Sequence, residues 1–141
     1  MSKIQIRGNC LHCAAQHAIV NGGIADHGFQ IKHGWGQRLG SCMGGYKVPM
    51  QGHAKEAMDV VAYYGQLASE YAARVFVEPK AVTVRVRADG KYQNVDKPWA
   101  DLDPRDQLRI AQKWEYDNDY QVKGLLAHQD YLLKAAAKHC D

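Results

Sequence analysis

Cysteine and histidine side chains are concentrated in one short stretch of this 141-residue chain. Three of the four cysteines and four of the seven histidines lie between residues 10 and 42. Cys10 and Cys13 form a Cys-x-x-Cys knuckle, whose two-residue gap lets both sulfurs reach about 2.3 Å from one metal ion. Cys42 follows in a second turn that is flanked by glycines. Because thiolate and imidazole donors in a tetrahedral set suit zinc, the stretch predicts a structural Zn²⁺ site.

The fourth ligand of such a site is expected to be a histidine, because Cys42 has no second cysteine at knuckle spacing. Our first choice is His27, which begins a His-Gly-Phe turn before an expected return strand. His33 is the second choice and His53 the third, whereas His12 lies inside the knuckle and is expected to point away. The predicted metal ligands are therefore Cys10, Cys13, His27 and Cys42.

Signatures of catalysis are absent from the sequence. No glutamate adjoins a predicted ligand to act as a general base, and the His-x-Glu with Pro-Cys-x-x-Cys pattern of zinc deaminases does not occur. There is also no Walker loop and no Gly-x-Ser-x-Gly elbow. We therefore expect a protein that is not an enzyme, and a zinc hydrolase or nuclease is the least favoured function.

Short strands in a glycine-rich head must position these ligands. Residues 3–7 and 16–20 alternate apolar and polar side chains, which predicts two strands. After a turn at residues 21–23, residues 28–33 are expected to form the returning strand. The order of strand, knuckle, hairpin and knuckle is typical of a zinc-ribbon or treble-clef head with a small antiparallel sheet. The predicted fold class is α+β.

Helical periodicity predicts one packed helix between about residues 53 and 74. Its apolar residues recur at spacings of three and four, on a stripe that is rich in small side chains. The expected buried stripe consists of Met58, Val61, Ala62, Gly65, Ala68, Ala72 and Val75. With so few large side chains, this stripe requires another element to pack closely against it.

A longer helix is expected over residues 103–138, where Asp103 suits the N-cap and the following proline suits the first helical position. Its expected apolar stripe consists of Leu108, Ala111, Val122, Leu125, Leu132 and Ala136. A continuous helix of about 35 residues would be about 52 Å long. It would either project and pair with a second copy as a homodimer, which we favour, or break near residues 117–119. We expect a zinc-stabilised domain at 1–98 and a helical part at 99–141.

A β-hairpin is predicted between the two helices. Residues 81–88 alternate cleanly, and the Asp-Gly pair at 89–90 is a strong signal for a two-residue turn, which places Arg87 opposite Tyr92. The expected outer face carries Thr83, Arg85, Arg87, Tyr92 and Asn94. Exposed arginine and aromatic side chains contribute strongly to binding interfaces. The candidate contact residues of the chain are Trp35, Arg38, Arg85, Arg87 and Tyr92.

Charge is distributed unevenly along the chain. Residues 1–55 carry six Lys or Arg against one acid, a balance of +5, whereas residues 98–141 carry six against eight, a balance of −2. A polyanion would therefore meet the N-terminal half. In this alternative hypothesis of nucleic-acid binding, the phosphate contacts are Lys3, Arg7, Lys32, Arg38 and Lys47. The Arg85, Arg87 and Tyr92 face would stack on exposed bases.

The sequence predicts a cytoplasmic location with no membrane contact. No apolar run approaches the roughly 20 residues of a membrane span, and the first residues lack the apolar stretch of a signal peptide. In a reducing compartment a close cysteine pair binds metal in preference to forming a disulfide.

Three motifs, Cys10-x-x-Cys13, His27-Gly28-Phe29 and Ser41-Cys42-x-Gly44, resemble small zinc-binding accessory proteins of bacteriophages and prophages. The resemblance extends to Trp99-Ala100-Asp101-Leu102 before the long helix. It implies His27 as the fourth ligand and implies little about activity. Small phage proteins of this size often bind and block a machine of the bacterial host cell, and this association motivates our first hypothesis. Our first hypothesis is a non-catalytic inhibitor of a host protein or ribonucleoprotein complex, for example an anti-CRISPR protein directed at a CRISPR effector.

Overall fold

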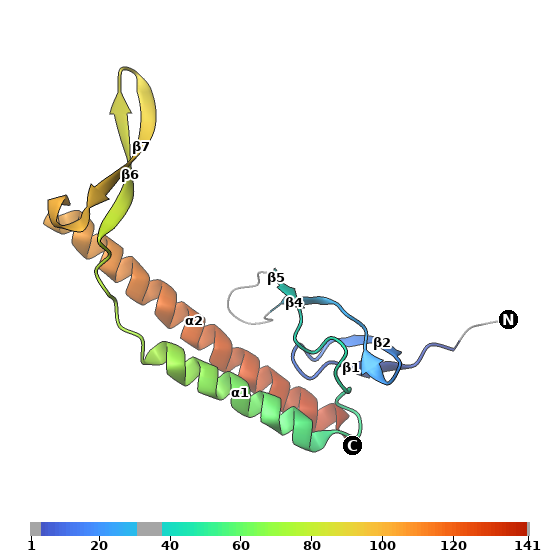
Figure 1. Ribbon diagram of the computed structural model, residues 1–141. Coiled ribbons are helices and arrows are strands. Elements are labelled where there is room, and N and C mark those ends of the chain that lie inside the picture. Colours follow the sequence, from blue (N-terminus) through green and yellow to red (C-terminus); the bar gives the residue numbers. More distant parts are fainter. Residues whose placement is uncertain (1–3, 31–37, 141) are drawn as a thin grey trace. The chain divides into compact units, whose positions relative to one another are not determined.

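The computed structural model describes residues 4–30 and 38–140 of the chain (Figure 1). The fold is α+β, with small antiparallel sheets and a long C-terminal helix, as predicted. Within the described ranges, no helix is both long and apolar enough to cross a membrane. The contact candidate Trp35 and the alternative ligand His33 lie outside the described residues, as do Lys3 and Lys32.

The chain forms two compact units. Residues 1–73 and 119–141 make up the first unit, and residues 74–118 make up the second. Helix α2 (Pro104–His139) is continuous and supplies residues to both units. The alternative of a helix break near residues 117–119 is therefore wrong.

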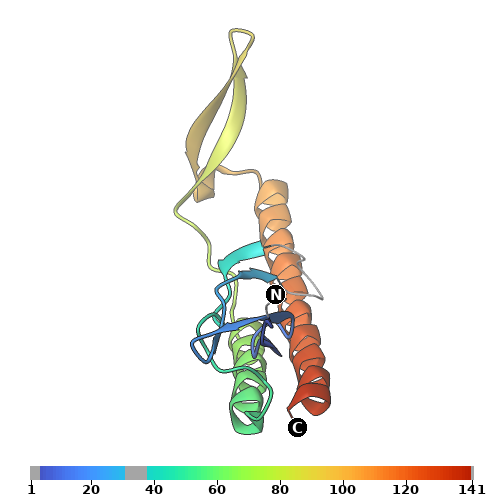
Figure 2. The same ribbon diagram turned by 90° about the vertical axis from the view of Figure 1, so that its right-hand side faces the viewer.

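The head of the first unit contains short strands in two sheets. β1 (Arg7–Asn9), β2 (Gln16–Val20) and β3 (Gly23–Ile24) form one antiparallel sheet, and β4 (Gly28–Gln30) pairs with β5 (Arg38–Ser41) (Figures 1 and 2). Asn21 and Gly22 both have positive φ, which turns the chain tightly from β2 into β3.

Two predictions for the head need correction. The strand expected at residues 3–7 begins only at Arg7, although the carbonyl of Ile6 accepts a hydrogen bond from Ile19 N–H at 2.8 Å. The strand that begins at Gly28 does not return onto β2, because the short β3 already closes that turn. It pairs instead with β5, a strand that the sequence pattern did not predict.

Helix α1 (Ala54–Ala72) agrees with the predicted helix to within about two residues. Its buried residues are Ala57, Val61, Tyr64 and Ala68. The predicted stripe was therefore partly wrong, because Met58 is exposed and Val75 lies beyond the end of the helix. Tyr64 supplies the large side chain at the centre of the buried face, between alanine and valine positions that admit α2.

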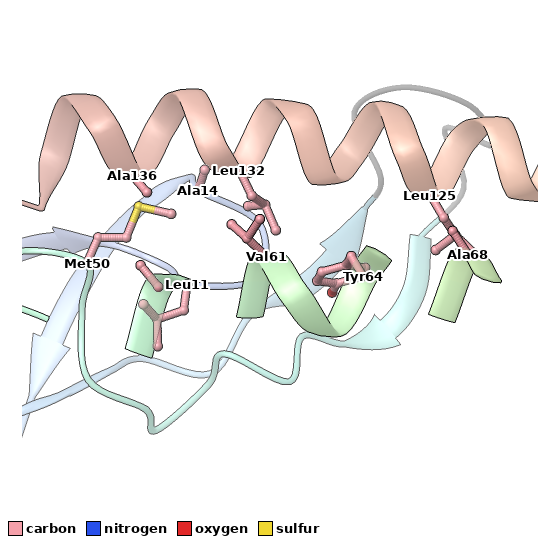
Figure 3. Packing of buried hydrophobic residues seen from close by; sticks show 10 residues of the cluster. Leu11, Ala14, Met50, Val61, Tyr64, Ala68, Leu125, Leu132 and Ala136 are labelled. Carbon is pink, nitrogen blue, oxygen red and sulfur yellow. The ribbon is translucent and has the colours of Figure 1, made fainter. Parts of the chain in front are cut away.

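The core of the first unit lies between α1 and the C-terminal part of α2, which run antiparallel (Figures 1 and 3). Its buried residues are Leu11, Ala14, Met50, Ala57, Val61, Tyr64, Ala68, Leu125, Leu132 and Ala136. Gln129 donates a side-chain hydrogen bond to the Val61 carbonyl at 3.0 Å. This amide lies over Gly65, where an added Cβ would overlap it, so Gly65 allows α2 to approach α1 closely. Leu11 and Ala14 anchor the head to the helix pair.

The second unit contains the hairpin of β6 (Ala81–Ala88) and β7 (Lys91–Pro98), the short helix η1 (Trp99–Asp101) and the start of α2. The register agrees with the prediction, since Arg87 is opposite Tyr92 and Arg85 is opposite Asn94. The hairpin strands are mostly exposed along their length.

Three aromatic rings support the base of the hairpin. Phe76 lies 5.8 Å from the ring of Trp99 and 5.9 Å from that of Trp114, measured between centroids. The predicted N-cap of α2 is present, because the Asp103 carboxylate accepts the backbone N–H of Arg105 at 2.8 Å. Leu108, which was expected on the apolar stripe, is exposed.

Candidate metal centre

Four side chains of the head converge on one point. The ligand atoms of Cys10, Cys13, His27 and Cys42 all lie within 4.8 Å of one another, and these four residues are called the metal centre below. The Sγ atoms of Cys10 and Cys42 are 3.7 Å apart. Cys13 Sγ lies 3.3 Å from His27 Nε2. The three cysteines are buried and the histidine is half-buried.

These separations fit a single tetrahedral ion. A metal–sulfur bond of about 2.3 Å and a metal–nitrogen bond of about 2.05 Å give tetrahedral edges of about 3.8 Å between two sulfurs and about 3.6 Å between sulfur and nitrogen. The separations of 3.7 Å and 3.3 Å lie within about 0.3 Å of these edges, and all four ligand atoms lie within 4.8 Å of one another. The metal centre can therefore hold one metal ion between four protein ligands.

The two cysteine turns orient backbone N–H groups toward sulfur in the same way. The His12 N–H donates to Cys10 Sγ and the Gly44 N–H donates to Cys42 Sγ, both at 3.4 Å. In each turn the donor is two residues after the cysteine, so each sulfur is held by its own backbone. Gly44 has no room for a side chain, because an added Cβ would overlap Cys10 Sγ.

The ring of His27 is oriented by its second nitrogen. Its Nδ1 lies 2.7 Å from the carbonyl oxygen of Ala25, which can only accept a hydrogen bond. A neutral imidazole therefore carries its proton on Nδ1, and its Nε2 lone pair faces Cys13 and the centre of the cluster. This is the usual arrangement of a metal-binding histidine.

The three thiols favour a single negative charge among themselves. Hydrogen bonds from Cys13 and Cys42 lower the pKa of Cys10 far below its ordinary value. The same contact with Cys10 raises the pKa of Cys13 to about 11, and hydrogen bonds with Cys10 and Cys13 raise the pKa of Cys42. Ionising all three sulfurs requires a positive charge at their centre, which a divalent cation supplies.

The knuckle is joined to both helices of the first unit. His12 is not one of the four clustered ligands, and its Nδ1 lies 3.1 Å from the hydroxyl oxygen of Tyr64 in α1. In α2, His128 donates its Nε2 hydrogen to the carbonyl of His12 at 2.7 Å. Burial lowers the pKa of His12 and raises that of Tyr64, so burial favours the neutral form of both side chains.

His17 lies beside the metal centre and was missed among the predicted ligands. Its Nε2 is 3.8 Å from Cys13 Sγ, and its ring stacks on His27 with centroids 3.7 Å apart and an angle of 17° between the planes. Burial and the neighbouring His27 lower the pKa of His17. Its position four residues after Cys13 was the available signal, since such short spacings are common between metal ligands. His53, the third choice as ligand, instead contacts the carbonyl of Gln51.

The contact candidates on the hairpin form one surface. The guanidinium carbon of Arg85 lies 4.4 Å from the ring centroid of Tyr92, and that of Arg87 lies 5.8 Å from it. Tyr92 is 59% exposed. These three residues are called the hairpin face below. Arg38 begins β5 in the head, which belongs to the other compact unit.

Chemically, four protein ligands would complete the coordination of a tetrahedral ion, and the hairpin face offers cations beside an aromatic ring. The two features belong to different compact units of the chain. Comparisons with protein-family models, with curated proteins and with solved structures found no match for this chain.

Proposed function

We propose that the chain is a non-catalytic binding protein whose head is held together by a structural Zn²⁺ ion. The observation that carries this proposal is the pair of separations of 3.7 Å and 3.3 Å, which match the edges of a tetrahedral zinc site. Three thiolates and one imidazole suit zinc better than calcium, magnesium or manganese. A coordination sphere that is filled by four protein ligands leaves no position for an activated water. The ion would therefore stabilise the fold and would not catalyse a reaction.

The composition of the head explains why a metal is needed there. The buried cluster around the sulfurs consists of Cys10, Cys13, Ile24 and Cys42, and the partly buried Ile19 and Phe29 pack against it. Such a small cluster provides little hydrophobic stabilisation, whereas a structural zinc ion contributes folding free energy directly.

X-ray absorption at the zinc edge tests the ligand set. For full-length protein loaded with zinc, we expect about three sulfur neighbours at about 2.3 Å and one nitrogen at about 2.0–2.1 Å. A first shell dominated by oxygen or nitrogen would contradict the proposed site.

For the binding partner, charge on the hairpin favours an anion. Residues 80–97 carry five Lys or Arg against two Asp, a balance of +3. None of these hairpin cations forms an ion pair with a described residue, and Asp96 is hydrogen-bonded to Thr83 at 2.9 Å. The cations are therefore available to a partner of opposite charge.

The hairpin face favours single-stranded nucleic acid among anionic partners. Its exposed tyrosine ring and the two guanidinium groups are planar groups on which unpaired bases stack, while lysines and arginines of the hairpin contact phosphates. We therefore propose single-stranded DNA or RNA as the ligand of the hairpin face.

Fluorescence anisotropy with labelled single-stranded and duplex oligonucleotides at several salt concentrations tests this partner. Replacing Arg85 and Arg87 with alanine should weaken single-strand binding by about tenfold or more and reduce the salt slope by about 1.4, the value for two phosphate contacts. The matched control replaces Arg105 and Arg109, two exposed arginines of α2, and should leave binding nearly unchanged. Equal losses in both double variants would refute the assignment to the hairpin face.

The competing partner is a host protein or ribonucleoprotein complex in the bacterial cytoplasm, the kind of target that small phage proteins often block. An acidic protein surface would meet the same arginine and tyrosine side chains. A photoreactive residue in place of Tyr92 tests it in nuclease-treated bacterial lysate. Capture of one host protein, together with no oligonucleotide binding at low salt, would replace nucleic acid by a protein as the partner.

A further inference from the structure

Two imidazole rings approach the same sulfur of the metal centre. His27 Nε2 lies 3.3 Å from Cys13 Sγ, and His17 Nε2 lies 3.8 Å from the same atom. The sulfur–nitrogen edge of a tetrahedral zinc site, about 3.6 Å, falls between these values. Each of the two Nε2 atoms is therefore close enough to Cys13 Sγ to bind the same metal ion as this sulfur.

The two rings are also parallel and in contact. Their centroids are 3.7 Å apart and their planes differ by 17°. Both Nε2 atoms lie within 3.8 Å of Cys13 Sγ. A modest side-chain movement of His17 would bring its Nε2 to the position that His27 Nε2 occupies.

The rings are held by different parts of the head. His17 belongs to β2, where its backbone is opposite Gly8 of β1. His27 precedes β4, and its Nδ1 is fixed by the carbonyl of Ala25 at 2.7 Å. This hydrogen bond makes His27 the preferred ligand, because it directs the Nε2 lone pair at the cluster before a metal binds.

We propose that His17 is a reserve ligand, which takes the imidazole position of the metal centre when His27 is lost or displaced. In the exchange the metal–nitrogen bond to His27 breaks and one to the Nε2 lone pair of His17 forms. Each imidazole binds the ion through the Nε2 lone pair of its neutral form, so one metal–nitrogen bond replaces another and no electron is transferred. The inference rests on the proposed zinc site and assigns to it a fifth residue.

Histidine variants of the full-length protein separate this role from that of an ordinary neighbour. Co²⁺ is titrated into metal-free protein, and its tetrahedral visible spectrum and affinity are measured for wild type, His17→Ala, His27→Ala and the double variant. We expect His27→Ala to retain about one tetrahedral Co²⁺ ion with roughly 10- to 100-fold weaker binding. Such a loss is typical of a site that keeps four protein ligands but positions them less well. Removing His17 as well should weaken Co²⁺ binding further and shift its visible bands, because a water then takes the place of the imidazole beside the three cysteines. A second double variant, His27→Ala with His53→Ala, is the matched control and should behave like His27→Ala alone.

A long-range ¹H–¹⁵N NMR spectrum of the imidazoles identifies the ligand directly. In His27→Ala, addition of Zn²⁺ should shift Nε2 of His17, whereas in wild type it should shift Nε2 of His27. If His27→Ala loses its helical circular dichroism, His27→Gln takes its place, because the glutamine amide can still donate to the Ala25 carbonyl.

The possible outcomes distinguish the two proposals. Failure of wild type and His17→Ala to bind metal would refute the zinc site itself. Normal binding by wild type, with His27→Ala as defective as the double variant, would refute the reserve ligand alone. The latter result would leave His17 as no more than a ring that stacks on His27 beside the metal centre.

Discussion

Replacing Gly44 with alanine should disrupt the metal centre without removing any of its ligands. A Cβ at residue 44 would overlap Cys10 Sγ and would lie 3.6 Å from both Cys42 Sγ and the Cβ of His12. Cys10 is fully buried, so its sulfur cannot move toward solvent to make room while it remains a ligand. The added methyl group therefore competes with the metal for the position of this sulfur.

The expected size of the effect follows from the number of ligands. Structural zinc binding is worth about 10–16 kcal/mol, so one of four ligands contributes about 3 kcal/mol, which corresponds to a roughly 100-fold change in the dissociation constant. Gly44→Ala should weaken zinc binding by about this factor, because Cys10 is the ligand that it displaces.

A competition titration of the full-length protein against a chromophoric zinc chelator measures the change. Gly22→Ala is the control, because a Cβ there has no atom within 4 Å. Gly22 has a φ of +80°, so alanine should cost about 1 kcal/mol in folding free energy while zinc affinity stays the same. Wild-type zinc affinity in Gly44→Ala would refute the packing argument.

Three further predictions concern the core and the head. Leu132 is 0% exposed and Leu133 is 43% exposed, so Leu132→Ala should lower the free energy of unfolding by about 2–5 kcal/mol and Leu133→Ala by about 1 kcal/mol or less in urea titrations; equal losses would contradict the assigned core. Cys13→Ser should abolish stoichiometric zinc binding and disorder the head, which an unchanged amide NMR spectrum of the head would disprove. Burial raises the pKa of Tyr64, so folding favours its neutral phenol. The contribution of Tyr64 to the free energy of unfolding is therefore fully present below about pH 10, its unfolded pKa, and is lost as the pH rises above that value. In urea titrations, the free energy of unfolding should therefore fall less between about pH 9 and pH 11 in Tyr64→Phe than in wild type. An equal fall in both proteins would exclude Tyr64 as the cause.

The features that were predictable from sequence depend on local geometry. Cys10 and Cys13 are brought together by a four-residue turn, and Cys42 lies in a second short turn of similar geometry. The register of the hairpin follows from its two-residue turn at residues 89–90. In each case a few neighbouring residues determine the structure.

The features that were missed depend on contacts between distant segments. Whether the strand at residues 28–30 pairs with β2 or with β5 is decided by tertiary structure, as is the position of His17 beside His27. The compact units also differ from the expected division at 1–98 and 99–141. Residues 1–73 and 119–141 form one unit and residues 74–118 the other, and α2 supplies residues to both. Helical periodicity alone could not tell which of two neighbouring stripes of α1 faces α2.

The metal content of full-length protein, purified without chelators, tests the central claim most directly. Elemental analysis should find about one zinc ion per chain, because the metal centre has one complete set of four ligands. Less than about half an equivalent of zinc, with no other transition metal in its place, would contradict the structural zinc site.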